Sequence, residues 1–230
     1  MAASPVELIN RRTLAEEAFD YLSTEILSGK LQAEERLVES EVAARLSISR
    51  APVREALTEL ERQGLAYSAA RKGVFVKAWT RHDLWEVAIL RASLEALAVR
   101  LAVPHITESD FTFLEQIIEE MEEADRREDV DRLISLDFDF HDCVVERCGH
   151  KRLQSMLYDM KLQIKIFRLM TKQTDYVSYP EMHRTFLAAL HKGDPENAYS
   201  TVYSHIMDSV EPALEAMPQN GFQTVSKKLM

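Results

Sequence analysis

The stretch from Ser47 to Gly64 constrains the fold of this chain more than any other, because it marks both ends of one short helix. An extended approach ends at Ser49 or Arg50, and Pro52 then occupies a first-turn position where a proline loses no hydrogen bond. Gly64 follows the last apolar position as a stop. The apolar residues of the stretch share one face, which we expect to be buried: Val53, Ala56, Leu57 and Leu60.

The opposite side of the first turns carries Ser49, Arg50 and Arg54. Arginine can fork onto guanine in the major groove, and the free amides of a helix N-terminus can hold phosphate. These residue types in this position predict a recognition helix that enters the major groove of DNA with its N-terminus first.

The segments upstream supply the rest of a helix-turn-helix. Helical spacing predicts one helix from Thr13 to Gly29 and a second from Glu39 to Leu46. The turn Ser47-Ile48-Ser49 then has the length that joins two helices of this motif.

The segment downstream predicts a wing. Two β-favouring runs, at residues 65–68 and 74–77, flank a basic tip that contains a glycine, so we expect a hairpin. The tip residues Arg71, Lys72 and Gly73 are expected to contact the DNA backbone or the minor groove. A solvated loop is the alternative interpretation of Arg71 and Lys72.

From Trp79 onward the apolar pattern is helical throughout, with a first helix predicted from Asp83 to Val103. Pro212 is expected to bend or end the last helix. The predicted fold class is mainly α, a winged helix-turn-helix (three helices and a β-hairpin wing) followed by an antiparallel bundle of about six helices. In order, the predicted segments are a flexible leader (1–12), the winged helix-turn-helix (13–78), a linker (79–82), an all-helical domain (83–217) and a flexible tail (218–230).

The net charge of −10 at first argues against a nucleic-acid partner, but the charge is unevenly distributed. Residues 1–78 are nearly neutral, with eleven Lys/Arg and twelve Asp/Glu, so the acidity belongs to the second half. Between Arg50 and Lys77 six basic residues outnumber three acidic ones. A surface that contacts phosphates is therefore expected in this part of the chain.

The sequence also indicates a compartment. No apolar run approaches membrane-spanning length, and the N-terminus lacks a basic and then apolar signal pattern. Cys143 and Cys148 would point about 140° apart on one helix, which disfavours a disulfide and fits a reducing environment. We therefore expect a cytoplasmic protein without a membrane partner.

A possible metal site involves four residues of the helical half. Asp137 and His141 are four apart, so their side chains can converge on one side of a helix. His183 and His205 lie about ten and eleven residues from the break near residues 193–194, which gives them equal depth in an antiparallel helix pair. Together these four could bind Zn²⁺, Ni²⁺ or Mn²⁺. The alternative is that each is an ordinary helix histidine, packed or solvated.

Arg91 and Glu95 form an i,i+4 pair on the first helix of the bundle. They can be a structural ion pair in which the arginine stem is packed. Alternatively, Arg91 faces the bundle cavity and forks onto the carboxylate of an anionic ligand.

At this point the residues resemble a known family. The N-terminal runs resemble the winged helix of GntR-type bacterial transcription regulators: Gly29-Lys30-Leu31, Glu35-Arg36-Leu37-Val38-Glu39, Ser49-Arg50 with Pro52-Val53-Arg54-Glu55-Ala56-Leu57, and Lys72-Gly73-Val74-Phe75-Val76. Residues further on resemble the all-helical, metal-binding FCD domain of the FadR subfamily: Arg91 with Leu94-Glu95, Asp137 with Phe140-His141, His183, Gly193-Asp194 and His205.

The resemblance implies a homodimer that binds a palindromic operator and responds to a small carboxylate effector in the helical bundle. It also implies that the metal ligands are Asp137, His141, His183 and His205. Two alternatives remain open at this stage. The helical half could be a metal-free dimerisation module, or the metal could activate water in a hydrolase, although the DNA-binding head argues against an enzyme.

Overall fold

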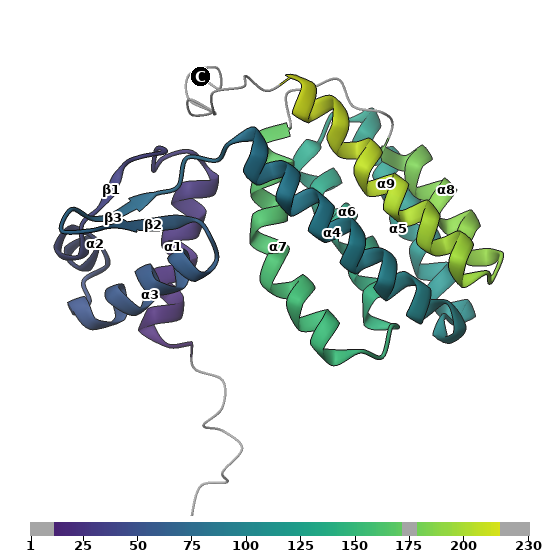
Figure 1. Cartoon of the computed structure of the whole chain (residues 1–230), viewed down its shortest axis with the longest axis horizontal. Coiled ribbons are helices and arrows are strands. Elements are labelled where there is room, and N and C mark those ends of the chain that lie inside the picture. Colours follow the sequence, from purple (N-terminus) through teal and green to yellow (C-terminus); the bar gives the residue numbers. More distant parts are fainter. Residues whose placement is uncertain (1–11, 172–178, 217–230) are drawn as a thin grey trace, which may run out of the picture. The chain divides into compact units, whose positions relative to one another are not determined.

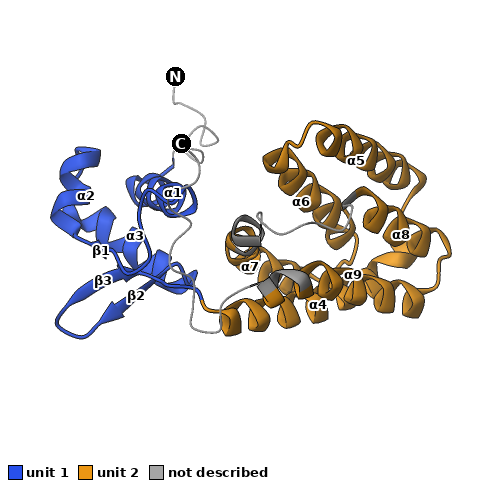
Figure 2. Cartoon of the chain, turned by 90° about the horizontal axis from the view of Figure 1, so that it is seen from above, with its two compact units in different colours: residues 1–79, 222–230 blue, residues 80–221 orange. Residues whose placement is uncertain are grey.

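The computed structural model describes residues 12–171 and 179–216 of the 230-residue chain. These residues divide between Trp79 and Thr80 into two compact units, called unit 1 and unit 2 below (Figure 2). Of the predicted leader (1–12) only Arg12 is described, and the predicted tail (218–230) lies outside the described residues.

Unit 1 contains the helices α1 (Leu14–Leu27), α2 (Glu39–Leu46) and α3 (Arg50–Arg62). Helix α1 begins after Thr13 because that side chain accepts a hydrogen bond from the Glu16 amide while the Glu16 carboxylate accepts one from the Thr13 amide. The left-handed Ser47, with φ 56°, ends α2 and turns the chain toward α3.

Helix α3 packs against α1 through its apolar face. The face predicted from spacing is confirmed, since each of its four residues is at most 2% exposed: Val53, Ala56, Leu57 and Leu60. The first turn of α3 therefore presents its other side to solvent, and Ser49, Arg50 and Arg54 are all exposed.

The strands of unit 1 are β1 (Arg36–Leu37), β2 (Ala66–Ala69) and β3 (Gly73–Val76). They form an antiparallel sheet in the order β1-β3-β2, with Leu37 opposite Val74 and Tyr67 opposite Phe75. The hairpin β2-β3 was predicted. Strand β1 was not, because two residues are too short to show an alternating pattern. The winged helix-turn-helix is confirmed.

All regular secondary structure among the described residues of unit 2 is helical (Figure 1). Its helices are α4 (Arg81–Ala102), α5 (Glu108–Arg126), α6 (Val130–Glu146), α7 (Lys151–Thr171), α8 (Tyr179–His191) and α9 (Pro195–Ala216), with a short 3-10 helix, η2 (Val103–His105), after α4. Helix α4 packs against α9, α7 and α6, and α5 packs against α6 and α8. Large side chains that are fully buried, such as Phe140, Phe186 and Met121, fill the interior.

One predicted helix start was wrong, and of the two outcomes predicted for Pro212, a bend or an end, the structure contradicts the end. Helix α4 begins at Arg81 and not at Asp83, because Thr80 and Asp83 form a capping box that starts the helix within the predicted linker. Helix α9 does not end at Pro212 but continues to Ala216. A proline near a C-terminus removes one backbone hydrogen bond, and the burial of Val210 and Leu214 on this helix offsets that loss.

One partly exposed ion pair ties α5 to α6. Asp110 caps α5 by accepting from the Thr107 amide at 2.8 Å, and Arg147 Nη2 donates to Asp110 Oδ1 at 2.6 Å. The Arg147 hydrogen bond outweighs the cost of burial, and the Thr107 amide adds to it, so the pKa of Asp110 falls to about 2. The folded protein therefore favours the carboxylate form of Asp110.

Because the pKa of Asp110 is lowered on folding, its contribution to stability is complete above the unfolded pKa near 4 and is lost as the pH falls toward 2. We expect Asp110→Asn to lower the free energy of unfolding by about 2 kcal/mol at pH 7. Urea unfolding of wild type and variant at pH 7 and pH 2.5 checks this. A loss of equal size at both pH values would contradict it, and Arg147→Gln should produce a smaller loss with the same pH trend.

Candidate metal centre and candidate nucleic-acid interface

Four polar side chains converge in the interior of unit 2. Asp137 and His141 extend from α6, His183 from α8 and His205 from α9, and each is at most 6% exposed. The structure thus brings together all four residues that the sequence grouped. His183 and His205 lie at the same depth in the helix pair, as predicted, because the centroids of their rings are 4.7 Å apart.

The distances within this cluster fit one bound ion. His183 Nε2 lies 3.4 Å and His141 Nε2 lies 3.7 Å from Asp137 Oδ1, while His141 Nε2 is 3.3 Å from His205 Nε2. One donor atom from each residue lies within 4.8 Å of the others. An ion that holds such donors at about 2.1 Å places tetrahedral neighbours about 3.4 Å apart. Three imidazoles and a carboxylate also suit Zn²⁺, Ni²⁺ and Mn²⁺ chemically.

Glu95, on α4, orients one of these histidines. Its Oε2 lies 2.6 Å from His141 Nδ1, which directs the other ring nitrogen, Nε2, into the cluster. Burial by itself would raise the pKa of Glu95, but the charges of Arg91 and His141 outweigh burial and lower it to about 2. Sequence reasoning paired Glu95 only with Arg91. The contact with His141 joins residues 46 positions apart, so no local spacing could indicate it.

Arg91 lies behind Glu95, next to the cluster. It is 3% exposed, its Nε donates to Glu95 Oε1 at 2.6 Å, and its Nη2 lies 3.7 Å from Asp137 Oδ2. Its Nη1 is buried without a hydrogen-bond partner among the described residues. The ion pair that the sequence suggested is therefore present, and one donor of the guanidinium is still available to a ligand.

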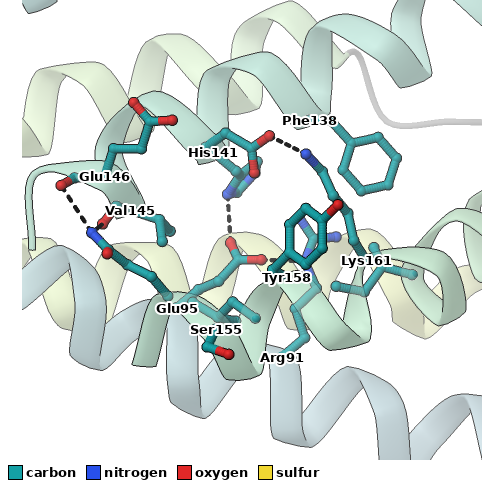
Figure 3. A pocket seen from close by; sticks show the side chains of 13 residues that line it. Arg91, Glu95, Phe138, His141, Val145, Glu146, Ser155, Tyr158 and Lys161 are labelled. Carbon is teal, nitrogen blue, oxygen red and sulfur yellow. Dashed lines mark hydrogen bonds and ion pairs between the residues drawn. The ribbon is translucent and has the colours of Figure 1, made fainter. Parts of the chain in front are cut away.

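A pocket of about 420 Å³ opens beside these residues, between α4, α6 and α7 (Figure 3). Arg91, Glu95 and His141 line its inner end. Lys161 and Tyr158 line it from α7, and Lys161 forms an ion pair with Asp142 of α6. The pocket thus connects the buried cluster with a second cation, at a size suited to a small molecule.

In unit 1 the predicted DNA-contacting residues lie on two exposed elements. Ser49 precedes the first turn of α3 and makes no capping hydrogen bond with its side chain, and Arg50 begins the helix. Arg54 is 68% exposed but forms a two-point ion pair with Glu39 of α2, with Nε and Nη2 at 2.9 and 2.8 Å from the carboxylate oxygens. The sequence did not indicate this partner, because it belongs to another helix.

The wing carries Arg71, Lys72 and Gly73 on its exposed tip. Arg71 adopts a left-handed backbone with φ 61°, and the Lys72 amide donates to the Ala69 carbonyl to close the turn. Glycine is favoured at position 73, because its φ of 107° is a backbone conformation that residues with a Cβ rarely adopt.

The fold of unit 1 is that of a DNA-binding module, and the helical unit 2 encloses a candidate ligand site. Comparison with known families agrees. A family model described as "Bacterial regulatory proteins, gntR family" matches residues 14–76, and one described as "FCD domain" matches residues 86–208. The chain belongs to the GntR family of bacterial transcription regulators and carries an FCD domain.

Curated relatives are similar over most of their length. The uncharacterized HTH-type transcriptional regulator YdhC of Bacillus subtilis is 29% identical over 197 residues, 84% of this chain and 88% of its own. The Nta operon transcriptional regulator of Aminobacter aminovorans is 31% identical over 182 residues, which cover 79% of this chain and 85% of that regulator. The probable D-xylose utilization operon transcriptional repressor of Paenarthrobacter nicotinovorans is 30% identical over 203 residues, which cover 86% of this chain and 88% of that repressor.

Solved structures share the fold at lower identity. McbR/YncC of E. coli superposes with a TM-score of 0.72 at 22% identity, covering 89% of this chain and 99% of its own. A putative GntR regulator from Rhodococcus sp. RHA1 gives 0.69 at 22% identity, with the same coverage. The curated relatives are named as transcription regulators and not as enzymes, which favours the regulator interpretation over the hydrolase alternative. Within the described ranges, every helix is too short or too polar to cross a membrane.

The contacts of Glu95 generate a stability prediction. Replacing Glu95 alone by leucine leaves the buried Arg91 with only the more distant Asp137, and an uncompensated buried charge typically lowers the free energy of unfolding by about 3 kcal/mol. The double variant Arg91→Met, Glu95→Leu should lose clearly less free energy of unfolding than Glu95→Leu alone, because no buried charge is then left without its partner. Urea unfolding of metal-free protein measures both, and equal losses in the single and double variants would contradict the ion-pair account.

Proposed function

We propose that this regulator binds a palindromic operator as a dimer and senses a small carboxylate metabolite through a divalent transition metal in unit 2, as in the FadR subfamily. The convergence of Asp137, His141, His183 and His205 in the core, beside a pocket, is the observation that carries the proposal. An interior built only for packing would place apolar side chains at these positions, since buried polar groups are costly without partners.

In this proposal, Asp137, His141, His183 and His205 hold the metal, and Glu95 keeps His141 in the ligating orientation. A bound divalent ion would supply positive charge and positions for a ligand oxygen. The effector's carboxylate accepts a hydrogen bond from the available Nη1 of Arg91. Lys161, which also lines the pocket, receives a second polar group of the effector.

DNA binding is assigned to the exposed residues of α3 and the wing. Arg50 and Arg54 contact base edges or nearby phosphates, Ser49 and the helix amides contact phosphate, and Arg71, Lys72 and Gly73 contact the backbone. Glu39 occupies the Nε edge of Arg54, so the edge that contains Nη1 remains for DNA. The protein acts in the cytoplasm, where operator DNA is accessible.

The metal part of the proposal predicts the effect of single histidines. After chelation, one equivalent of Zn²⁺, Ni²⁺ or Mn²⁺ should raise the melting temperature of wild type, and His183→Ala should abolish this rise. His191→Ala is the matched control, because His191 lies on the same helix but is exposed and stacks on Phe111. Glu95→Gln should weaken metal binding by roughly 10- to 100-fold in calorimetry.

A screen of small carboxylates against the metal-loaded protein then tests sensing. A carboxylate that raises the melting temperature only in the presence of metal, and lowers operator affinity, supports the proposal. If no metal binds in stoichiometric amount, the helical unit is a metal-free dimerisation module. If metal binds but no carboxylate changes either measurement, the metal is structural.

The recognition helix generates a prediction for DNA. Arg54→Ala should weaken binding to an operator selected from random duplexes by ~1–3 kcal/mol, as expected for the loss of a forked base contact. Lys72→Ala should weaken operator and unrelated DNA alike and reduce the salt dependence by about one phosphate contact. Arg62→Ala, in the last turn of α3, is the control. Unchanged affinity of Arg54→Ala in titrations at fixed salt would refute the role of Arg54.

A further inference from the structure

One row of residues on α4 points away from the pocket. Glu86, Leu90, Ser93, Leu97 and Arg100 recur at spacings of four and three, so they follow a line within an arc of about 80° on the helix. We call these five residues the α4 row. In Figures 1 and 2, α4 and α9 form one side of unit 2, and no described helix of this unit lies over the outer side of α4.

The α4 row is partly apolar and partly exposed to solvent. Leu90 is 48% exposed, and Ser93 and Leu97 are partly exposed. Of the charged end residues, Glu86 is 61% exposed and lies 3.3 Å from His82, and Arg100 is 41% exposed and lies 3.4 Å from Glu196 of α9, so each would exchange an exposed partner within its own chain for one in the second copy. The Ser93 hydroxyl donates to the Ile89 carbonyl at 2.8 Å, so covering this residue would leave no side-chain hydrogen bond unmade.

The order of residue types in the row is nearly symmetric about Ser93. Glu86 lies seven residues before Ser93 and Arg100 seven residues after it, while Leu90 lies three residues before it and Leu97 four residues after it. When two copies of α4 cross antiparallel at Ser93, Glu86 of each copy meets Arg100 of the other, and Leu90 meets Leu97. A parallel pairing would bring like charges together. Two-fold symmetric interfaces require such self-complementarity.

We infer that the α4 row is the contact between two copies of this chain, crossing antiparallel at Ser93. This inference rests on the proposed dimeric function and names its surface. The small serine at the crossing lets the two helices approach closely, with the leucines packed on either side. Arg91 and Glu95 lie on the inner face of the same helix, so the helix that contacts the effector also contacts the second copy.

Sedimentation equilibrium of the full-length protein tests the surface. Wild type should be a dimer, and Leu90→Asp should raise the dimer dissociation constant by ~100-fold, because the substitution occurs twice in a symmetric interface. Phe113→Asp is the matched control, since Phe113 is also 48% exposed but lies on α5 at the other side of unit 2. Circular dichroism verifies that each variant keeps its helix content.

Charge reversal tests the antiparallel register. Glu86→Arg and Arg100→Glu should each weaken the dimer by roughly tenfold, and the double variant should restore it, because opposite charges then meet again. A double variant no tighter than the singles overturns the register. If wild type is a dimer and Leu90→Asp leaves its dissociation constant unchanged, the α4 row is not the dimer contact, although the proposed dimer is supported. A monomeric wild type overturns both this inference and the proposed homodimer, whereas the metal and carboxylate measurements remain independent of it.

Discussion

The contact between Glu95 and His141 is the interaction on which the arrangement of unit 2 depends. It ties α4 to α6 in the interior, and it is stabilised on one side by Arg91 and on the other by the cluster around Asp137. Buried charges are tolerated only when they are paired, so α4, α6, α8 and α9 must be positioned together. The geometry of the candidate metal centre and the packing of the bundle thus depend on the same buried charges.

Helix α4 has a separate role on each side. Its inner side provides Arg91 and Glu95 to the pocket, and its outer side carries the α4 row. It is also the first helix after unit 1, beginning at Arg81. A ligand that accepts a hydrogen bond from Arg91 therefore contacts the same turn of α4 that carries Leu90. In our proposals this links effector binding to the pairing of two copies and to the spacing of their DNA-binding units.

The site could be predicted from sequence to the extent that its residues obey helical spacing. Asp137 and His141 are one turn apart, and the break at residues 193–194 fixes the relative depth of His183 and His205. Contacts between separate helices could not be predicted in this way. Glu95 with His141, and Arg54 with Glu39, join residues whose sequence separations follow from packing and not from any period.

The sequence by itself determined most of the elements of this protein, strand β1 excepted, because caps, glycine stops and apolar spacing are local. It defined a helix that begins near Arg50 and stops before Gly64, the buried face of that helix and the hairpin of the wing. The tertiary structure decided what lies between elements. It placed Glu95 against His141, left one nitrogen of Arg91 available beside a pocket, and set Glu39 against Arg54. These outcomes depend on distances between helices, which only packing of the whole core can fix.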